Sequence, residues 1–171
     1  MTISVLFVCM GNVCRSPMAE ALMRHMVAQA GLDDQIVVDS AGTGDWHVGE
    51  PPHRGTRRVL ADHGVRTDGM AARMIGPGDL HHFDYLIVMD GANLREVQRL
   101  AKHYGRRGVI ARLLDYADPA GVGGVRDVPD PYYDGRFGYV YDLVAAGCAG
   151  LLAALQRDHA LSRAAQNEDE D

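Results

Sequence analysis

The sequence predicts an α/β fold: a single three-layer domain in which a four-stranded parallel sheet has helices on both faces. Short apolar runs rich in β-branched residues alternate along the chain with longer segments of helical periodicity. Such alternation implies right-handed crossovers between parallel strands, with helices covering both sides of the sheet. The 171 residues suit one domain with a sizeable core. We expect this domain to span residues 1–162, and residues 163–171 to form an acidic, disordered tail.

The four strands are expected at four apolar runs. The first covers residues 3–8 and is nearly continuous, as in a strand that is buried on both faces. The second, residues 35–39, is followed by a Ser-Ala-Gly-Thr-Gly sequence typical of a loop. Residues 85–89 and 109–114 supply the third and fourth strands.

Helices are expected between these strands and at the end of the chain. Ser16, followed by Pro, Met, Ala and Glu, is a good helix start, and Gly31 is a natural stop. Residues 56–63 and 93–104 also have helical character. Residues 139–159 form the closing helix, in which small residues indicate close packing.

Two segments between these elements are predicted to be loops. Residues 44–52 contain a Trp and a Pro-Pro pair, and residues 117–135 are rich in Gly, Pro and Asp. A loop as long as the second one is usually functional or disordered in a compact domain.

The composition argues against several functional classes. There are 17 basic and 23 acidic residues, so an anion site must be built locally rather than by a general positive field. Three cysteines give neither a disulfide framework nor a zinc pair, and the eight histidines lack ligand spacing. The N-terminus does not resemble a signal peptide, and residues 3–10 are too short to span a bilayer. We therefore expect a cytoplasmic protein that uses no metal or other cofactor, binds no nucleic acid and does not insert into membranes.

The segment Cys9–Pro17 carries the strongest chemical signal. It leaves the carboxyl end of a buried strand and enters a helix, which is where open α/β sheets bind ligands and where free N–H groups attract anions. The same field favours a thiolate at Cys9, which makes this residue a candidate nucleophile. Arg15, six residues later, can return to the loop and grip two oxygens of a phosphate.

Other residues of this segment suit a tight anion-binding loop. Gly11 permits close approach of the backbone, and Asn12 tolerates a left-handed conformation. Ser16 can donate a hydrogen bond towards the Cys9 sulfur. Three alternatives remain open: a small core cysteine, a metal shared by Cys9 and Cys14, or a nucleotide-binding loop. The second lacks zinc spacing, and the third lacks the Lys that such a loop requires.

A phosphate ester also needs an acid that protonates its leaving group. Asp130 is a candidate because it lies between two prolines in the long loop, which stiffen the backbone around it. The alternative is that Asp-Pro is ordinary turn chemistry. The Cys9 loop favours the catalytic interpretation, since it supplies a nucleophile for the acid to assist.

These two motifs resemble those of the low-molecular-weight protein tyrosine phosphatase family. Cys9–Pro17 is similar to the family's nucleophile loop, and Asp130-Pro-Tyr-Tyr is similar to its acid motif. The sequences Ser40-Ala-Gly-Thr, Trp46-His-Val-Gly and Met89-Asp, with a following Asn93, fall between them in the family's order. The resemblance extends from residue 3 to about residue 156.

The resemblance implies a role for each matching residue. Cys9 would attack phosphorus, Arg15 would bind the phosphoryl oxygens, and Asp130 would protonate the leaving phenol and then activate water. Asn12 and Ser40 would hold the loop, and Ser16 would assist the thiolate. The pocket walls would be formed by Met10, Val13, Trp46, Tyr132 and Tyr133. Cys14 could form a reversible disulfide with Cys9.

Some of these roles have simpler alternatives. Trp46 could merely anchor its loop, and Tyr132 and Tyr133 could be packing residues. The sequence departs from the family at His53, where an Asp is usual, and at Met70, where a His is often found. Both positions would support the phosphate-binding loop indirectly.

The expected partner is a phosphotyrosine-containing protein or peptide, and the expected state is a monomer or a weak dimer. Three other functions compete. Protein-arginine phosphatases resemble this chain but typically have Thr where Val13 stands, and an apolar residue favours an aromatic ester. Arsenate reductases require further cysteines, and Cys148 falls on an apolar helix, where burial is expected. A catalytically silent phosphate-binding module would not need the set of Cys9, Arg15 and Asp130.

Overall fold

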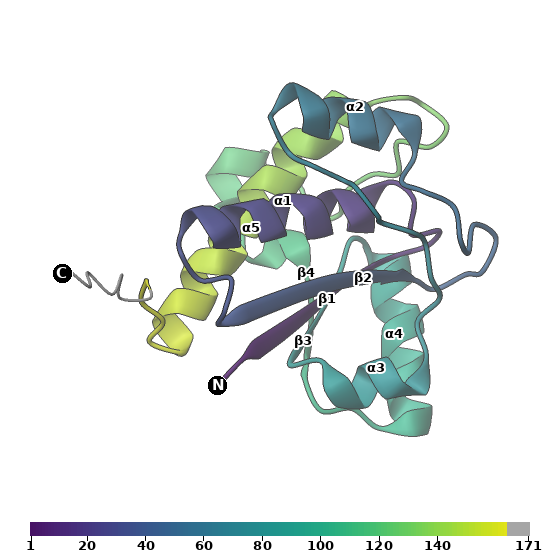
Figure 1. Ribbon diagram of the computed structural model, residues 1–171. Coiled ribbons are helices and arrows are strands. Elements are labelled where there is room, and N and C mark those ends of the chain that lie inside the picture. Colours follow the sequence, from purple (N-terminus) through teal and green to yellow (C-terminus); the bar gives the residue numbers. More distant parts are fainter. Residues whose placement is uncertain (164–171) are drawn as a thin grey trace, which may run out of the picture.

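The predicted α/β fold is confirmed by the computed structural model, which describes residues 1–163 (Figure 1). Four parallel strands form one sheet in the order β2-β1-β3-β4. Their bounds are Ile3–Cys9 (β1), Ile36–Gly42 (β2), Tyr85–Val88 (β3) and Val109–Arg112 (β4). The acidic tail expected at residues 163–171 lies, beyond its first residue, outside the described residues.

Helices cover both faces of the sheet and make it the middle of three layers (Figure 1). Two long helices, α1 and α5, pack on one face together with α2, and two others, α3 and α4, pack on the opposite face. The bounds of the helices are Arg15–Gln29 (α1), Arg54–Asp62 (α2), Pro77–His82 (α3), Gly91–Tyr104 (α4) and Phe137–Asp158 (α5). Short 3-10 helices span Leu113–Asp115 and Pro119–Val122.

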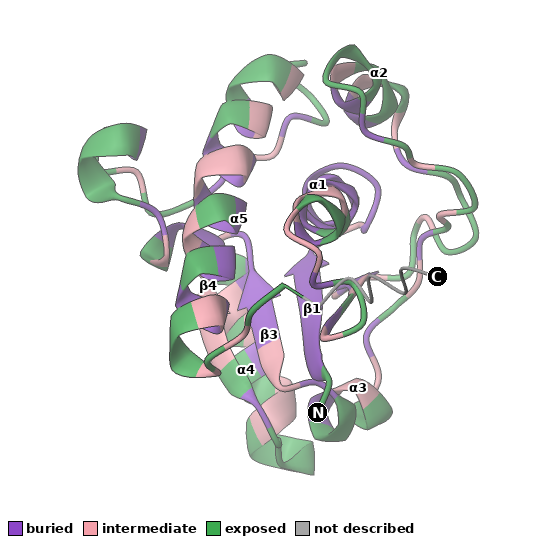
Figure 2. Cartoon of the chain, turned by 60° about the vertical axis from the view of Figure 1, so that its left-hand side comes forward, coloured by how far each residue is buried: buried purple, intermediate pink, exposed green. Residues whose placement is uncertain are grey.

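The alternation of side chains along β1 divides the core into two layers. Val5 and Phe7 belong to the larger cluster with α1 and α5, whereas Leu6 and Val8 belong to the cluster with α3 and α4. All four side chains are fully buried, as expected for a central strand with both faces covered. The burial colours of Figure 2 show β1 as a buried strand. Each fully buried Val, Leu or Phe side chain contributes about 1.5–3 kcal/mol to hydrophobic stabilisation.

Three details of the predicted secondary structure were wrong. Helix α3 was not predicted, because two of its six residues are Pro77 and Gly78, which favour turns. The second strand was expected to end at residue 39, but its pairing with β1 continues to Gly42. The fourth strand was expected to reach residue 114, but a 3-10 turn begins at Leu113.

Helix α5 is long and apolar enough to cross a membrane by length and composition alone. Its apolar character has a local explanation in the fold. Nine of its residues are buried, among them Cys148, and the helix packs against α1 and the 3-10 turn after β4. The expected burial of Cys148 is confirmed.

Because all four strands are parallel, their carboxyl ends lie at one edge of the sheet. The loops that follow β1, β2 and β3 therefore start close together, and a ligand site is expected there. The long loop returns to this edge, since the Val128 N–H donates to the Met89 carbonyl just beyond β3.

Candidate active site

The segment between β1 and α1 forms a tight loop whose carbonyl groups point outward. The carbonyls of Cys9 and Met10 accept from Thr43 and Gly44 in the loop after β2. The Val13 carbonyl accepts from His53, at 2.7 Å. A loop that turns its carbonyls outward presents N–H groups to its centre, and such a concavity binds anions.

The Cys9 sulfur receives hydrogen bonds from within this loop. It accepts from the Asn12 N–H at 3.3 Å and lies 2.9 Å from the Ser16 hydroxyl oxygen. The Asn12 side-chain amide donates to the same Ser16 oxygen at 2.8 Å, which leaves the hydroxyl proton available for the sulfur. Hydrogen bonds of this kind stabilise a thiolate.

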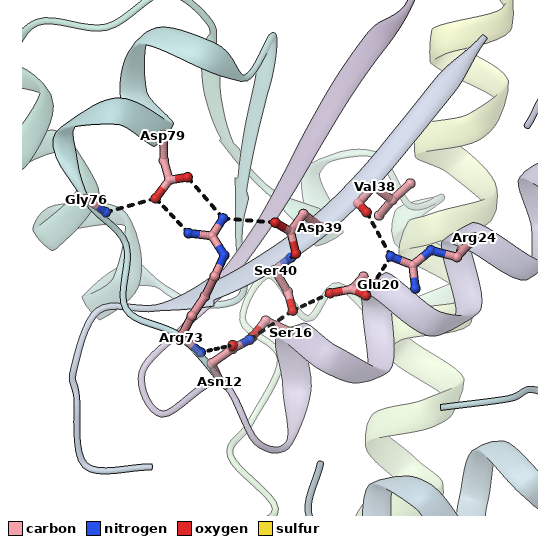
Figure 3. A network of polar contacts seen from close by, with 10 residues as sticks. All are labelled: Asn12, Ser16, Glu20, Arg24, Val38, Asp39, Ser40, Arg73, Gly76 and Asp79. Carbon is pink, nitrogen blue, oxygen red and sulfur yellow. Dashed lines mark hydrogen bonds and ion pairs between the residues drawn. The ribbon is translucent and has the colours of Figure 1, made fainter. Parts of the chain in front are cut away.

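A polar network behind the loop fixes Asn12 (Figure 3). Asn12 has φ of 56°, the left-handed conformation expected from the sequence. Its amide group donates to Ser40 at 2.9 Å and accepts from the Arg73 N–H at 3.0 Å. Ser40 in turn donates to the buried Glu20 carboxylate at 2.8 Å. The network therefore connects α1 and β2 to the residue that determines the shape of the loop.

Burial raises the pKa of the Glu20 carboxyl, although the Ser40 hydrogen bond and the nearby Arg24 oppose this effect. A raised folded-state pKa stabilises the protein at low pH, and this contribution is lost as the pH rises through the folded value. We expect Glu20→Gln to remove this dependence. As the pH rises above about 4.3, the ordinary pKa of Glu, the free energy of unfolding of the wild type should fall relative to that of the variant. Urea unfolding of both proteins across pH 4–8 measures this difference in the free energy of unfolding. A difference that does not change with pH would contradict the prediction.

Arg15 is buried, with 3% of its side chain exposed, and faces two carboxylates. One guanidinium nitrogen donates to Asp90 at 2.6 Å and to the Val128 carbonyl at 2.9 Å. The other lies 3.7 Å from the Asp130 carboxylate. Burial alone would lower the pKa of Arg15, but the charges of Cys9, Asp90 and Asp130 outweigh it and the pKa is raised. The side chain is thus held as a fixed cation beside the Cys9 loop.

Asp130 lies at the mouth of the same cavity, with 31% of its side chain exposed. One carboxylate oxygen accepts from the N–H of Tyr132 at 3.0 Å, and the other faces Arg15. The structure therefore brings together the nucleophile, the phosphate-binding cation and the acid predicted from two distant motifs.

A cavity of about 360 Å³ opens over the Cys9 loop. Ten of the thirteen predicted site residues line it: Cys9, Met10, Gly11, Val13, Cys14, Arg15, Trp46, Asp130, Tyr132 and Tyr133. The other three predicted residues do not line the cavity: Asn12 and Ser16 belong to the loop itself, and Ser40 lies behind it and accepts from the Asn12 side chain. Trp46 and Tyr133 are the most exposed of the wall residues.

The three cysteines are in different environments. Burial, reinforced by the charges of Asp130 and Cys9, raises the pKa of the Cys14 thiol to about 12. Burial also raises the pKa of Cys148. All three are free thiols, and a regulatory disulfide between Cys9 and Cys14 stays a prediction.

Two residues of the site were not predicted from the sequence. His47 lines the cavity, and Asp90 holds Arg15. Both stand in segments that the family resemblance singled out, but a lone loop His and a strand-end Asp have no spacing signature of their own. Of the two departures from the family, His53 supports the loop through Val13, and Met70 packs against the main core.

The chain is similar to known proteins along most of its length. The sequence model of the family described as low molecular weight phosphotyrosine protein phosphatase matches residues 4–161. The low-molecular-weight protein-tyrosine-phosphatase YfkJ of Bacillus subtilis (strain 168) is 48% identical over 159 residues, covering 93% of this chain and 99% of that protein. A low-molecular-weight protein-tyrosine-phosphatase of Streptomyces coelicolor is 47% identical over 167 residues, covering 96% and 100%.

Solved structures resemble the chain to a similar extent. The crystal structure of YfkJ from Bacillus subtilis superposes with a TM-score of 0.87 at 47% identity, covering 92% of this chain and 97% of that one. A drosophila arginine phosphatase superposes with a TM-score of 0.81 at 35% identity, covering 89% and 97%. The proteins similar to this chain therefore include one named a tyrosine phosphatase and one named an arginine phosphatase.

Proposed function

The chain belongs to the low-molecular-weight phosphotyrosine protein phosphatase family, and from its site we propose that it hydrolyses phosphotyrosine in proteins through a phosphocysteine at Cys9. The observation that carries this proposal is the convergence of Cys9, Arg15 and Asp130 on one cavity. The catalytic domain would comprise residues 1–162.

The first chemical step transfers the phosphoryl group to the enzyme. The Cys9 thiolate attacks phosphorus, the bond from phosphorus to the phenolic oxygen breaks, and protonated Asp130 gives its proton to that oxygen. Arg15 and the loop N–H groups bind the three remaining phosphoryl oxygens, whose charge they stabilise in the transition state.

The second step releases phosphate. Asp130, now a carboxylate, takes a proton from water as the water oxygen attacks phosphorus, and the sulfur leaves as a thiolate. The Ser16 hydroxyl, 2.9 Å from the sulfur, stabilises that leaving group. The Asn12–Ser40–Glu20 network keeps the loop in shape through both steps.

The walls of the cavity favour an aromatic substrate. Trp46, Tyr132 and Tyr133 offer apolar rings around the opening, and Val13 offers no polar group to a guanidinium. The partner is thus a phosphotyrosine-containing protein or peptide. We further propose that the protein is cytoplasmic and acts as a monomer or weak dimer.

A substrate panel tests the proposed function. Wild-type protein in excess chelator and reductant is incubated with a phosphotyrosine peptide, a phosphoarginine peptide and arsenate. We expect rapid phosphate release from the first alone, measured by colorimetric phosphate assay. Preference for phosphoarginine, or reduction of arsenate, would replace the proposal with one of those activities, and phosphate binding without turnover would indicate a silent binding module.

A further inference from the structure

The Tyr132 ring, which forms one wall of the cavity, lies between two histidine rings. Its centroid is 5.6 Å from that of His47, at a tilt of 45°, and 5.5 Å from that of His53, in an edge-on arrangement. Edge-to-face and tilted contacts at these distances are favourable for aromatic rings. We call His47 and His53, as they hold Tyr132, the imidazole clamp.

His53 connects the long loop, which carries Asp130 and Tyr132, to two other parts of the fold. Its backbone N–H donates to the Val13 carbonyl of the nucleophile loop at 2.7 Å. Its ring stacks on Phe137, at the start of α5, with centroids 4.9 Å apart. Gly55 makes this contact possible, since a Cβ there would come within 2.4 Å of the Phe137 ring.

His53 also caps α2, because its Nδ1 accepts from the Gly55 N–H at 3.0 Å. An Asp, the usual family residue at this position, could form such a cap, since Asp is among the preferred capping residues. An Asp has no ring, however, and could not stack on Phe137 or face Tyr132. The histidine therefore adds an aromatic contact to the ordinary capping role.

His47 ties the other side of Tyr132 to the nucleophile loop. Its Nδ1 lies 2.7 Å from the Glu50 carboxylate, which fixes the orientation of the ring. Its ring edge lies over Gly11, where a Cβ would come within 3.1 Å of the imidazole. Both histidines thus join Tyr132 to the loop that carries Cys9.

The position of Tyr132 is coupled to that of Asp130, because the Tyr132 N–H donates to the Asp130 carboxylate. We propose that His47 and His53 are positioning residues that hold the Asp130 carboxyl over the leaving oxygen of the substrate. This inference rests on the proposed function, since it concerns the protonation of the leaving group. Small misplacement of a catalytic group can cost up to about 100-fold in rate.

Two substitutions at residue 53 separate positioning from capping. His53→Asp keeps a cap and loses the ring, whereas His53→Phe keeps a ring and loses the cap. Values of kcat/KM are measured for phenyl phosphate, whose leaving group needs a proton, and for 2,4-dinitrophenyl phosphate, whose leaving group does not. We expect His53→Asp to lower kcat/KM about 10-fold for phenyl phosphate and less than about 2-fold for the dinitrophenyl ester.

His53→Phe should retain kcat/KM for both esters within about 2-fold, while its thermal midpoint falls about 2–4 °C for the lost cap. His47→Asn should resemble His53→Asp, and adding His53→Asp to Tyr132→Ala should cause no further loss. His63→Asn is the matched control, because His63 stacks on Tyr141 and does not line the cavity. It should leave both kinetic constants unchanged.

The outcomes distinguish the clamp from the proposed function. Equal losses for both esters in the Asp variant, or retained activity in His53→Asp and loss in His53→Phe, would overturn the clamp while leaving the phosphatase reaction intact. A wild type that hydrolyses neither aryl ester would overturn the proposed function, and the clamp with it.

Discussion

Replacement of Cys9 by serine is expected to abolish hydrolysis of phosphotyrosine peptides, with a loss on the order of 10⁵-fold or more. A thiol is a far better nucleophile than a hydroxyl at neutral pH, because sulfur is intrinsically very nucleophilic and a serine hydroxyl is scarcely ionised. The hydrogen bonds from Asn12 and Ser16 stabilise negative charge on sulfur at this position. A serine would keep the polar contacts but could not form the phosphorylated intermediate at a useful rate.

Single-turnover hydrolysis of a phosphotyrosine peptide, followed by phosphate release, measures this loss. Circular dichroism of the variant should match that of the wild type, since the substitution changes one buried atom in an otherwise satisfied loop. Cys148→Ala is a useful comparison because it removes a thiol outside the cavity, and any loss there would reflect stability. Residual activity of Cys9→Ser above about 1% of wild type would contradict a phosphocysteine mechanism.

The parts of the site that could be predicted from the residues themselves are encoded locally, whereas Ser40 and Trp46 were expected only from the family resemblance. Cys9, Asn12, Arg15 and Ser16 lie within eight consecutive residues, and a strand before them and a helix after them determine their arrangement. The left-handed conformation of Asn12 could be anticipated for the same reason. Asp130 could be predicted because a stiff Pro-Asp-Pro sequence accompanied the nucleophile loop.

The parts that could not be predicted depend on residues far apart in the chain. Asp90, which was not predicted, holds Arg15 across 75 positions. The contacts of Tyr132 with His47 and His53 likewise join the long loop to the loop before α2. The partners of such side chains cannot be read from the sequence, because only the folded sheet brings the strand ends together.

The errors in secondary structure have the same origin. The second strand continues beyond Asp39 because β1 offers it a pairing partner as far as Cys9. Helix α3 is short and contains Pro77 and Gly78, so its local composition favours a turn. In both cases tertiary contacts override local preference.

Replacement of Asp130 by alanine is expected to slow phosphotyrosine hydrolysis by about 10²–10⁴-fold, the range over which a general acid–base contributes. The loss in kcat/KM should shrink as the leaving group improves, because 2,4-dinitrophenolate departs without a proton. With that ester the first step remains fast while water is no longer activated. Phosphocysteine should therefore accumulate in the variant, and intact-mass measurement after an acid quench would detect the added phosphoryl group on Cys9.

A control substitution in the same loop distinguishes the loss of the proton donor from the mere loss of a negative charge. Asp134 is exposed and its carboxylate accepts from the Arg136 N–H, so Asp134→Ala removes one negative charge without touching the cavity. It should change kcat/KM by less than about 3-fold for either ester, since exposed charges interact weakly. If Asp130→Ala instead reduced both esters equally and no phosphoenzyme accumulated, Asp130 would serve only to position Arg15, 3.7 Å away. Because the two carboxylates differ in their access to Cys9, a specific loss at Asp130 alone identifies the proton donor.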